Sequence, residues 1–275
     1  KSFNVDVFPH GRSHYRMTFF VPVPGLRLDH YRVAFDELYA ADEMVDLDMP
    51  GLIEGLESLP CCVTDKKGEH YGDPLNIAFV ADIEDLYYAF LRAGWDETET
   101  IHRVSVWKTI RSAVSGANYR YSPVSPLYVF GRGQDAALQR ARDSIHERNH
   151  LRIWLTPMRY EGTPVWIGQI SRDIGVRLSA KTIFTHKIDP VVDETREFLI
   201  EDLAYTQSLE KFGYVQGVGA APYELPRRNL TGDPYITDGL RAVMWVSDAV
   251  VSLDSLELLD LGAHPSTALP TAVPE

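Results

Sequence analysis

Two strand-like runs within residues 144–177 constrain the fold of this chain more than any other feature. Apolar and polar residues alternate over 150–156, which is the pattern of a half-buried strand. A turn-forming Glu-Gly-Thr-Pro follows at 161–164, and residues 165–171 form a second run with high strand propensity. We therefore predict an antiparallel hairpin at about 150–172. One face of its first strand carries polar and aromatic side chains: His150, Arg152, Trp154 and Thr156.

The bulk composition is that of a folded protein with an acidic surface. The chain has 275 residues, of which 45% are hydrophobic and 24% charged, and this length favours one large domain. Its formal net charge of -12 disfavours nucleic acid as a partner, because the long-range field repels polyanions. No apolar run approaches the roughly 18 residues that a membrane-spanning helix requires.

The two cysteines, Cys61 and Cys62, are adjacent. Disulfides usually join residues whose Cα atoms are farther apart than those of neighbours, so such a bond is rare. We therefore predict no disulfide framework, and we interpret both cysteines as small buried residues without a metal or redox role.

Apolar spacing along the rest of the chain predicts helices at 83–93, 105–115, 135–146 and 192–209. Short strand patterns occur at 4–7, 15–21, 75–80, 127–130, 183–188 and 242–246. Together they predict an α+β or layered α/β fold, with a mixed, largely antiparallel sheet built around the hairpin and helices packed on it. The acidic segment at 36–57 is broken by proline and glycine, and we interpret it as a solvated surface.

The domain organisation that we predict is a single fold with terminal arms. An arm or hairpin at 1–49 precedes the main domain at 50–220, an extension at 221–261 completes the same fold, and a proline-rich tail occupies 262–275. A tail without apolar periodicity is ordered only when it is tied down. We therefore expect the arms to dock on a protein partner or on further copies of the chain.

Several blocks occur in a collinear order that resembles the LssY carboxy-terminal domain family. They are DPLNIAFV at 73–80, RAGW at 92–95, SPLYVFGR at 125–132, IHERNHLRIWLTP at 145–157, GTPVWIGQISRDIGVR at 162–177 and THKIDPVVDETREFLIEDL at 185–203. The resemblance implies a bacterial cell-envelope context, in which such domains accompany membrane phosphatase-like or transporter-like regions, and it implies no activity. We therefore expect a periplasmic, extracellular or other envelope location, with the cytoplasm as the alternative.

A first candidate site is His-Glu-Arg-Asn-His at 146–150, which matches the zinc-binding pattern H-E-x-x-H. That pattern places two imidazoles one turn apart only on a continuous helix. Because His150 begins the alternating strand, we expect no metal and no cofactor, and zinc at His146, Glu147 and His150 is the alternative.

A second candidate is Gly-Arg-Gly-Gln-Asp-Ala at 131–136, between a predicted strand and a predicted helix. The next strand lacks the acid that would hold a ribose, which disfavours a dinucleotide. We predict that Arg132 and Gly133 bind one small anion at the helix N-terminus, and a tight turn without a ligand is the alternative.

A third candidate consists of the polar residues around the hairpin: Arg148, His150, Arg152, Arg172, Asp173, His186, Lys187 and Asp189. Arginine holds a carboxylate or phosphate with two hydrogen bonds, and a His–Asp pair relays a proton. Structural ion pairs and turn caps are the other interpretation.

The function that we predict is a non-catalytic, envelope-associated domain that binds a partner or a small anion. One alternative is a hydrolase, either metal-dependent through His146, Glu147 and His150 or phosphate-directed through Arg152, Arg172 and His186. The other alternative is a structural subunit of an assembly.

Overall fold

The computed structural model describes residues 2–7, 15–20, 38–97, 126–141, 148–177 and 185–265. The chain divides into two compact units, Lys1–Leu38 and Tyr39–Glu275. In the first unit, β1 (Ser2–Val7) pairs with β2 (Tyr15–Phe20) as an antiparallel hairpin, as the strand pattern predicts.

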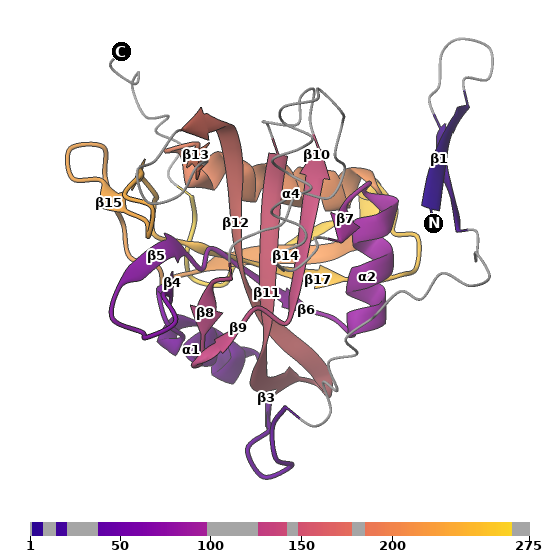
Figure 1. Ribbon diagram of the computed structural model, residues 1–275. Coiled ribbons are helices and arrows are strands. Elements are labelled where there is room, and N and C mark those ends of the chain that lie inside the picture. The colour runs from indigo at the N-terminus through magenta and orange to yellow at the C-terminus, as the bar shows by residue number, and fades with distance from the viewer. Residues whose placement is uncertain are drawn as a thin grey trace. The chain divides into compact units, whose positions relative to one another are not determined.

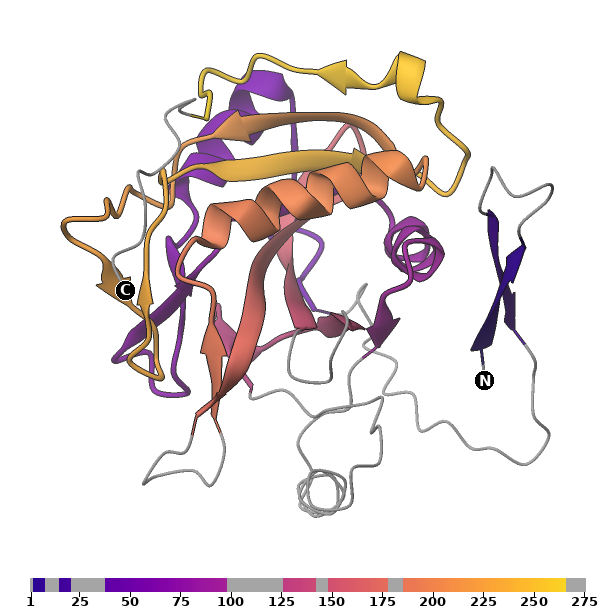
Figure 2. The same cartoon turned by 90° about the horizontal axis from the view of Figure 1, so that it is seen from above.

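The second unit is mostly sheet, and its main sheet has ten strands (Figures 1 and 2). Eight strands follow one another across it: β18 (Glu257–Leu258), β14 (Leu209–Val215), β17 (Arg241–Val246), β6 (Ile77–Val80), β12 (Thr163–Arg177), β11 (Arg148–Tyr160), β10 (Ala136–Ala141) and β7 (Asp96–Glu97). The remaining two are β13 (Thr185–Ile188), which pairs with β12, and β3 (Val45–Leu47), which pairs with β11. The sheet is mixed, because β17 runs parallel to β6, β18 to β14 and β3 to β11.

A smaller, four-stranded sheet lies in the order β5 (Tyr71–Pro74), β4 (Cys62–Thr64), β8 (Tyr128–Val129) and β9 (Arg132–Gly133). A separate two-stranded ribbon joins β15 (Arg227–Arg228) to β16 (Pro234–Tyr235). Strand β5 packs against β12 of the main sheet, so the smaller sheet covers part of the larger one.

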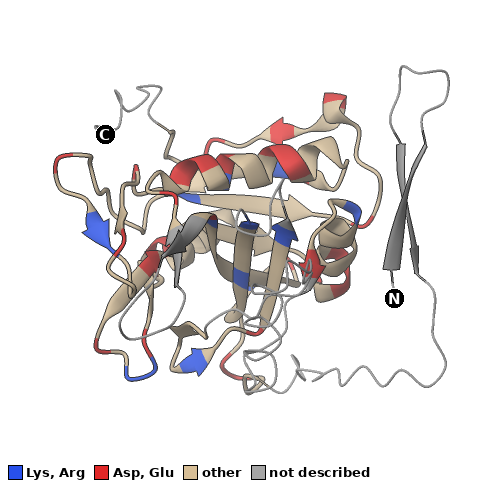
Figure 3. Cartoon of the chain, turned by 45° about the horizontal axis from the view of Figure 1, so that its top comes forward, with Lys and Arg blue, Asp and Glu red and all other residues tan. Residues whose placement is uncertain are grey.

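Three α-helices belong to the described residues: α1 (Met49–Ser58), α2 (Ile83–Arg92) and α4 (Val192–Tyr205). Leu52 and Leu56 of α1 join the core that contains Trp154, whereas Phe90 of α2 packs edge-on against Phe79 at 5.6 Å. Acidic residues colour much of α2 and α4 in Figure 3, while arginines colour parts of the strands. Among the described residues, no helix has both the length and the apolar character needed to cross a membrane.

Strands β11 and β12 are the longest in the main sheet, and their register shows which side chains share each face. In their antiparallel register Trp154 lies opposite Ile167 and Leu155 lies opposite Trp166. Both tryptophans are at most 1% exposed, as expected for packing residues. The prediction of a half-buried strand is wrong, however, because every residue from 148 to 156 is buried. The polar face of β11 is therefore covered as well as the apolar one.

The helix predicted at 135–146 is also wrong, since residues 136–141 form β10. Its residues pair with β11, with Leu138 opposite Leu151 and Gln139 opposite His150. The four-residue recurrence of alanine suits a helix, but pairing with a long neighbouring strand overrides local propensity. The rest of that segment, the predicted helix at 105–115 and the end of the tail at 266–275 lie outside the described residues.

The predicted helices at 83–93 and 192–209 correspond to α2 and α4. Gly94, with φ 78°, ends α2 as the sequence indicates, but α4 stops at Tyr205 and β14 begins at Leu209. Helix α1 is an element that the sequence analysis missed. It forms in the acidic segment because Pro50 occupies the first turn, where no amide bond is lost, and Asp48 accepts a hydrogen bond from the Gly51 amide at 3.0 Å.

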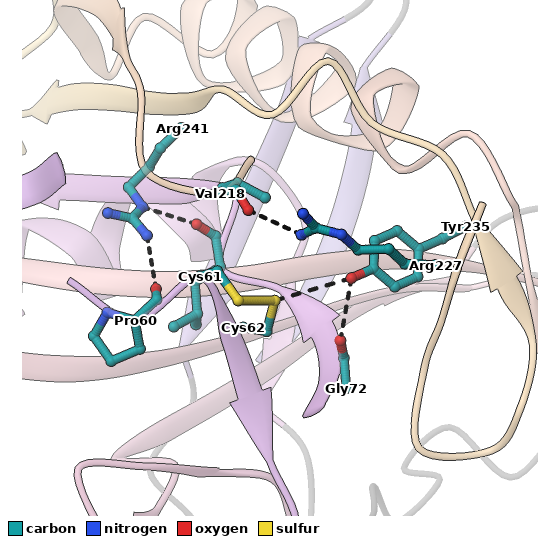
Figure 4. The surroundings of a disulfide bond; sticks show 9 residues. Pro60, Cys61, Cys62, Gly72, Val218, Arg227, Tyr235 and Arg241 are labelled. Carbon is teal, nitrogen blue, oxygen red and sulfur yellow. Dashed lines mark hydrogen bonds between the residues drawn. A yellow bond between two sulfur atoms is a disulfide. The ribbon is translucent and has the colours of Figure 1, made fainter. Parts of the chain in front are cut away.

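The prediction that the cysteines form no disulfide is wrong as well, because the structure joins Cys61 to Cys62 as a disulfide between neighbours (Figure 4). The predicted burial is confirmed for Cys62. The bond lies in the connection between α1 and β4. Cys62 is buried at 3% exposure, while Cys61 is partly exposed.

Arg196 of α4 is a buried cation that forms hydrogen bonds between this helix and the segment before β17. It donates two hydrogen bonds of 2.9 Å to the Asp238 carboxylate and one of 3.0 Å to the Leu240 carbonyl. Burial by itself lowers the pKa of Arg196, but the hydrogen bonds and charges of Asp238 and Asp193 offset it and the net shift is upward.

We predict that Arg196→Met lowers the free energy of unfolding by about 3–5 kcal/mol, because it leaves the Asp238 and Asp193 carboxylates without their cation. Urea denaturation measures this loss. The control is Arg228→Met, since exposed Arg228 donates only to the Gly232 carbonyl among the described residues, and its effect should stay below about 0.5 kcal/mol. Similar losses in the two variants would contradict the account.

Candidate functional site

A cluster of buried polar side chains lies on the face of β11 and β12 that also carries Trp154. The register places His150 opposite Ser171 and Arg152 opposite Gln169, so alternation puts all four on this face. The "polar cluster" comprises these side chains and four others: Arg148, Asp173, Asp73 of β5 and Asn229 of the loop after β15. All eight are at most 8% exposed.

His150 and Asp173 form a close pair within the polar cluster. The distance between His150 Nε2 and Asp173 Oδ2 is 2.6 Å. Arg148 lies two residues before His150, on the same face of β11. It donates a 2.9 Å hydrogen bond to the Gln139 side-chain oxygen on β10. These contacts fix the orientations of the His150 imidazole and the Arg148 guanidinium at the edge of the polar cluster.

Arg152 occupies the middle of the polar cluster and makes few bonds. Its Nη1 donates to Gln169 Oε1 at 2.9 Å, which is its sole hydrogen bond to a described residue. Arg152 Nε and Gln169 Nε2 are buried and have no hydrogen-bond partner in the part of the chain that the structure describes. Burial lowers the pKa of Arg152, and the charges of Asp73 and Asp173 oppose this shift. Within the described part of the chain, Arg152 therefore has one hydrogen-bond acceptor for its several donors.

Asp73 faces Arg152 from the smaller sheet. Its Oδ1 accepts a 3.1 Å hydrogen bond from Asn229 Nδ2. Burial raises the pKa of Asp73, and the Asn229 bond and the Arg152 charge only partly offset it, while Asp173 and Asp233 raise it further. The neutral acid is thus favoured at a higher pH than for a free aspartate, and its protonation leaves the cluster more positive.

The predicted residues divide between the two faces of the sheet. His150, Arg152 and Asp173 come together, but Arg172 lies opposite Asn149 and belongs to the other face. There its Nη1 is 3.5 Å from Asp189 and 3.6 Å from Glu194 of α4. Arg152 and Arg172 therefore cannot hold the same phosphate.

The remaining candidates are placed less fully. His186 belongs to β13, where its backbone pairs with Val176, and its side chain lies outside the described part of the structure. His146 and Glu147 of the zinc pattern also lie outside the described residues, and His150 is part of a strand. The continuous helix through His150 that this pattern requires is therefore not present.

Arg132 and Gly133 lie in a hairpin, not before a helix. Phe130 and Gly131, with φ 54° and 72°, form the tight turn between β8 and β9, and β10 follows. Arg132 donates two hydrogen bonds to the Asp135 carboxylate, at 3.1 and 2.9 Å, and one of 2.9 Å to the Tyr39 hydroxyl. The premise of an anion at a helix N-terminus is lost, and the Arg132 charge is already paired.

Asp73, Gln169, Ser171 and Asn229 are the members of the polar cluster that the sequence analysis missed. The alternation signal that selects Arg152 extends across the hairpin to Gln169, so the register alone could have found it. Asp73 opens a block quoted for the family resemblance, yet nothing local indicates that it faces Arg152. Asn229 is more than 50 residues from β12 and carries no local signal.

One group outside the polar cluster has the ligand types of a cation site. Asp65, Glu69 and His70 lie together on the turn between β4 and β5. Glu69 and His70 are exposed, and the hydrogen bond from His70 lowers the pKa of Asp65. Exposed acidic turns of this kind are common without an ion.

Comparison with known proteins identifies the family. No match is found among curated proteins, and none among solved structures. A family model described as LssY C-terminus matches residues 54–240, a range that includes all eight residues of the polar cluster. The resemblance indicated by the sequence blocks is thereby confirmed. Since the match covers more than half of the chain, the protein belongs to the LssY C-terminus family.

Proposed function

We propose that this domain binds a small anionic ligand, bearing a carboxylate or a phosphate, in the polar cluster. The observation that carries the proposal is the state of Arg152, a buried guanidinium with one hydrogen bond to a described residue and an unpartnered Nε. Leaving a buried cation so poorly bonded costs several kcal/mol unless a partner compensates. An oxyanion is the partner that the guanidinium geometry suits.

The arrangement of donors supports an oxyanion over a cation. Nη1 of Arg152 is engaged by Gln169, so Nε and Nη2 form the edge that remains for two parallel hydrogen bonds. Gln169 Nε2 adds a neutral donor beside this edge. The carboxylates of Asp73 and Asp173 oppose the ligand's charge, and the raised pKa of Asp73 reduces this opposition.

The burial of the cluster limits the size of the ligand. Arg152 is 8% exposed and Gln169 is fully buried, so only a small group reaches both. Within a non-catalytic, envelope-associated protein, as we infer this one to be, such a site serves to hold a small solute or one anionic group of a larger partner.

We predict that Arg152→Lys weakens binding of inorganic sulfate by about tenfold, or 1.4 kcal/mol, because lysine keeps the charge and loses the two-bond geometry. Isothermal titration calorimetry with the full chain measures the change. Arg172→Lys is the matched control, since Arg172 lies three residues beyond Gln169 on β12, pairs with Asp189 and belongs to the opposite face. Absence of sulfate binding in the wild type, or equal weakening in both variants, would rule out this site.

A pH dependence follows from the raised pKa of Asp73. As the pH falls through that raised pKa, the carboxylate becomes neutral and no longer repels the anion, so sulfate affinity should rise, and it should do so at a higher pH than titration of an ordinary aspartate would produce. Sulfate remains a dianion as Asp73 titrates and adds no titration of its own.

The control for the pH experiment is Asp73→Asn, whose oxygen still accepts the Asn229 bond and whose charge is zero. This variant should bind sulfate above the pKa of Asp73 about as tightly as the wild type does below it, and should show a much flatter profile. The same slope in both proteins would assign the pH dependence to other groups and not to Asp73.

A further inference from the structure

We propose that the Cys61–Cys62 disulfide is a reversible thiol–disulfide site, reduced by a dithiol, that controls the position of β5 and thereby the polar cluster. The switch is a local one. Its effect on ligand affinity rests on the proposed function, whereas its effect on β5 does not.

The disulfide has little to contribute to global stability. A cross-link stabilises mainly by closing a loop in the unfolded chain, and the gain grows with the number of residues enclosed. Cys61 and Cys62 are adjacent, so the loop is the smallest that the chain can form. Reduction is therefore expected to leave the fold intact, and the consequences of the bond have to be sought among its neighbours.

Those neighbours connect the disulfide to β5 (Figure 4). Cys62 Sγ lies 3.9 Å from the Tyr235 hydroxyl, and this hydroxyl donates to the Gly72 carbonyl at 3.5 Å. Cys62 also pairs with Pro74 across the β4–β5 ladder, and the Leu75 amide donates to the Cys61 carbonyl at 2.8 Å. Cys62 thus touches the strand that carries Asp73, and Cys61 is bonded to the residue that follows this strand.

Close packing leaves β5 little freedom to absorb a movement. A Cβ atom on Gly72 would lie 2.9 Å from side-chain carbons of Leu230 and Val63. The residue after Gly72 is Asp73, which is bonded to Asn229 and faces Arg152. A shift of Cys62 Sγ or of the Tyr235 ring therefore moves the Asp73 side of the polar cluster.

The chain on the other side of the disulfide is fixed by Arg241. This guanidinium is fully buried and donates to the Pro60 carbonyl at 2.9 Å (Figure 4). It also donates to the carbonyl oxygens of Leu56 and of Leu75, the latter at 2.8 Å. Because α1, the residues before Cys61 and the Leu75 carbonyl are held in place, opening of the disulfide is taken up mainly at Cys62, Tyr235 and residues 71–74.

The difference in exposure between the two residues, with Cys61 partly exposed and Cys62 buried, sets the order of reduction. A thiolate of the dithiol attacks Sγ of the partly exposed Cys61, forms a mixed disulfide with it and releases Cys62 as a thiolate, which takes up a proton. The second thiol of the reductant then attacks the mixed disulfide, closes its own disulfide and releases Cys61. Two electrons pass to the protein, which gains two thiols, and the dithiol becomes a cyclic disulfide.

The test compares the full chain before and after dithiothreitol, without denaturant. We expect alkylation and mass spectrometry to detect two new thiols, with the circular dichroism spectrum unchanged. Amide hydrogen exchange should lose protection at residues 72–76, and sulfate should bind more weakly, on the order of fivefold, because the polar cluster is less well preorganised. A Cys61→Ser/Cys62→Ser double variant should show the amide exchange and sulfate affinity of the reduced protein, and dithiothreitol should change neither.

The Tyr235→Phe variant distinguishes reduction of the disulfide from its effect on β5. It removes the hydroxyl between Cys62 and Gly72 while keeping the ring, so the disulfide should be reduced as before with a smaller change in exchange at 72–76. The proposal is overturned if dithiothreitol produces no thiols in the folded protein, or if thiols appear while amide exchange at 72–76 is unchanged. It is also overturned if the oxidised and reduced proteins bind sulfate equally tightly. If sulfate binds in neither state, the anion site fails, and the exchange response alone then decides whether the disulfide controls β5.

Discussion

The polar cluster depends on one constraint, which is the cost of burying charged side chains. The strands β11 and β12 hold several such side chains away from water on one face. An isolated buried charge is costly, so each has to meet a partner of suitable geometry. Arg196 meets this requirement fully through Asp238, and His150 lies 2.6 Å from Asp173. Arg152 differs, because its nearest acids act on it through their charge while its Nε has no bonded partner among the described residues. This difference separates a structural arginine from one suited to a ligand.

The same constraint relates the proposed anion site to the rest of the fold. The main sheet supplies the rigid positions of Arg152 and Gln169, and the smaller sheet brings Asp73 over them. Strand β5 is bonded in turn to the segment around Cys61, whose other side is fixed by buried Arg241. A bond between two neighbouring cysteines can thus influence a site that neither of them touches.

Alternation along β11 is a local property, and it was sufficient to place His150 and Arg152 on one face. The half-buried character assigned to that strand was wrong because burial of the polar face depends on distant segments. Pairing with a partner strand also converted residues 136–141 from a predicted helix into β10. Asp73 and Asn229 reach the cluster through long-range packing, which no periodicity encodes. The family resemblance, in contrast, was evident from collinear blocks and is confirmed over residues 54–240.

The most direct test of the central claim is a crystal structure of the protein grown with selenate, whose selenium is located by anomalous scattering. The account predicts a selenate in the polar cluster with two of its oxygens within hydrogen-bond distance of Nε and Nη2 of Arg152, and with Gln169 Nε2 beside it. A structure in which selenate binds only elsewhere, with Arg152 Nε bonded to another part of the chain, would contradict it.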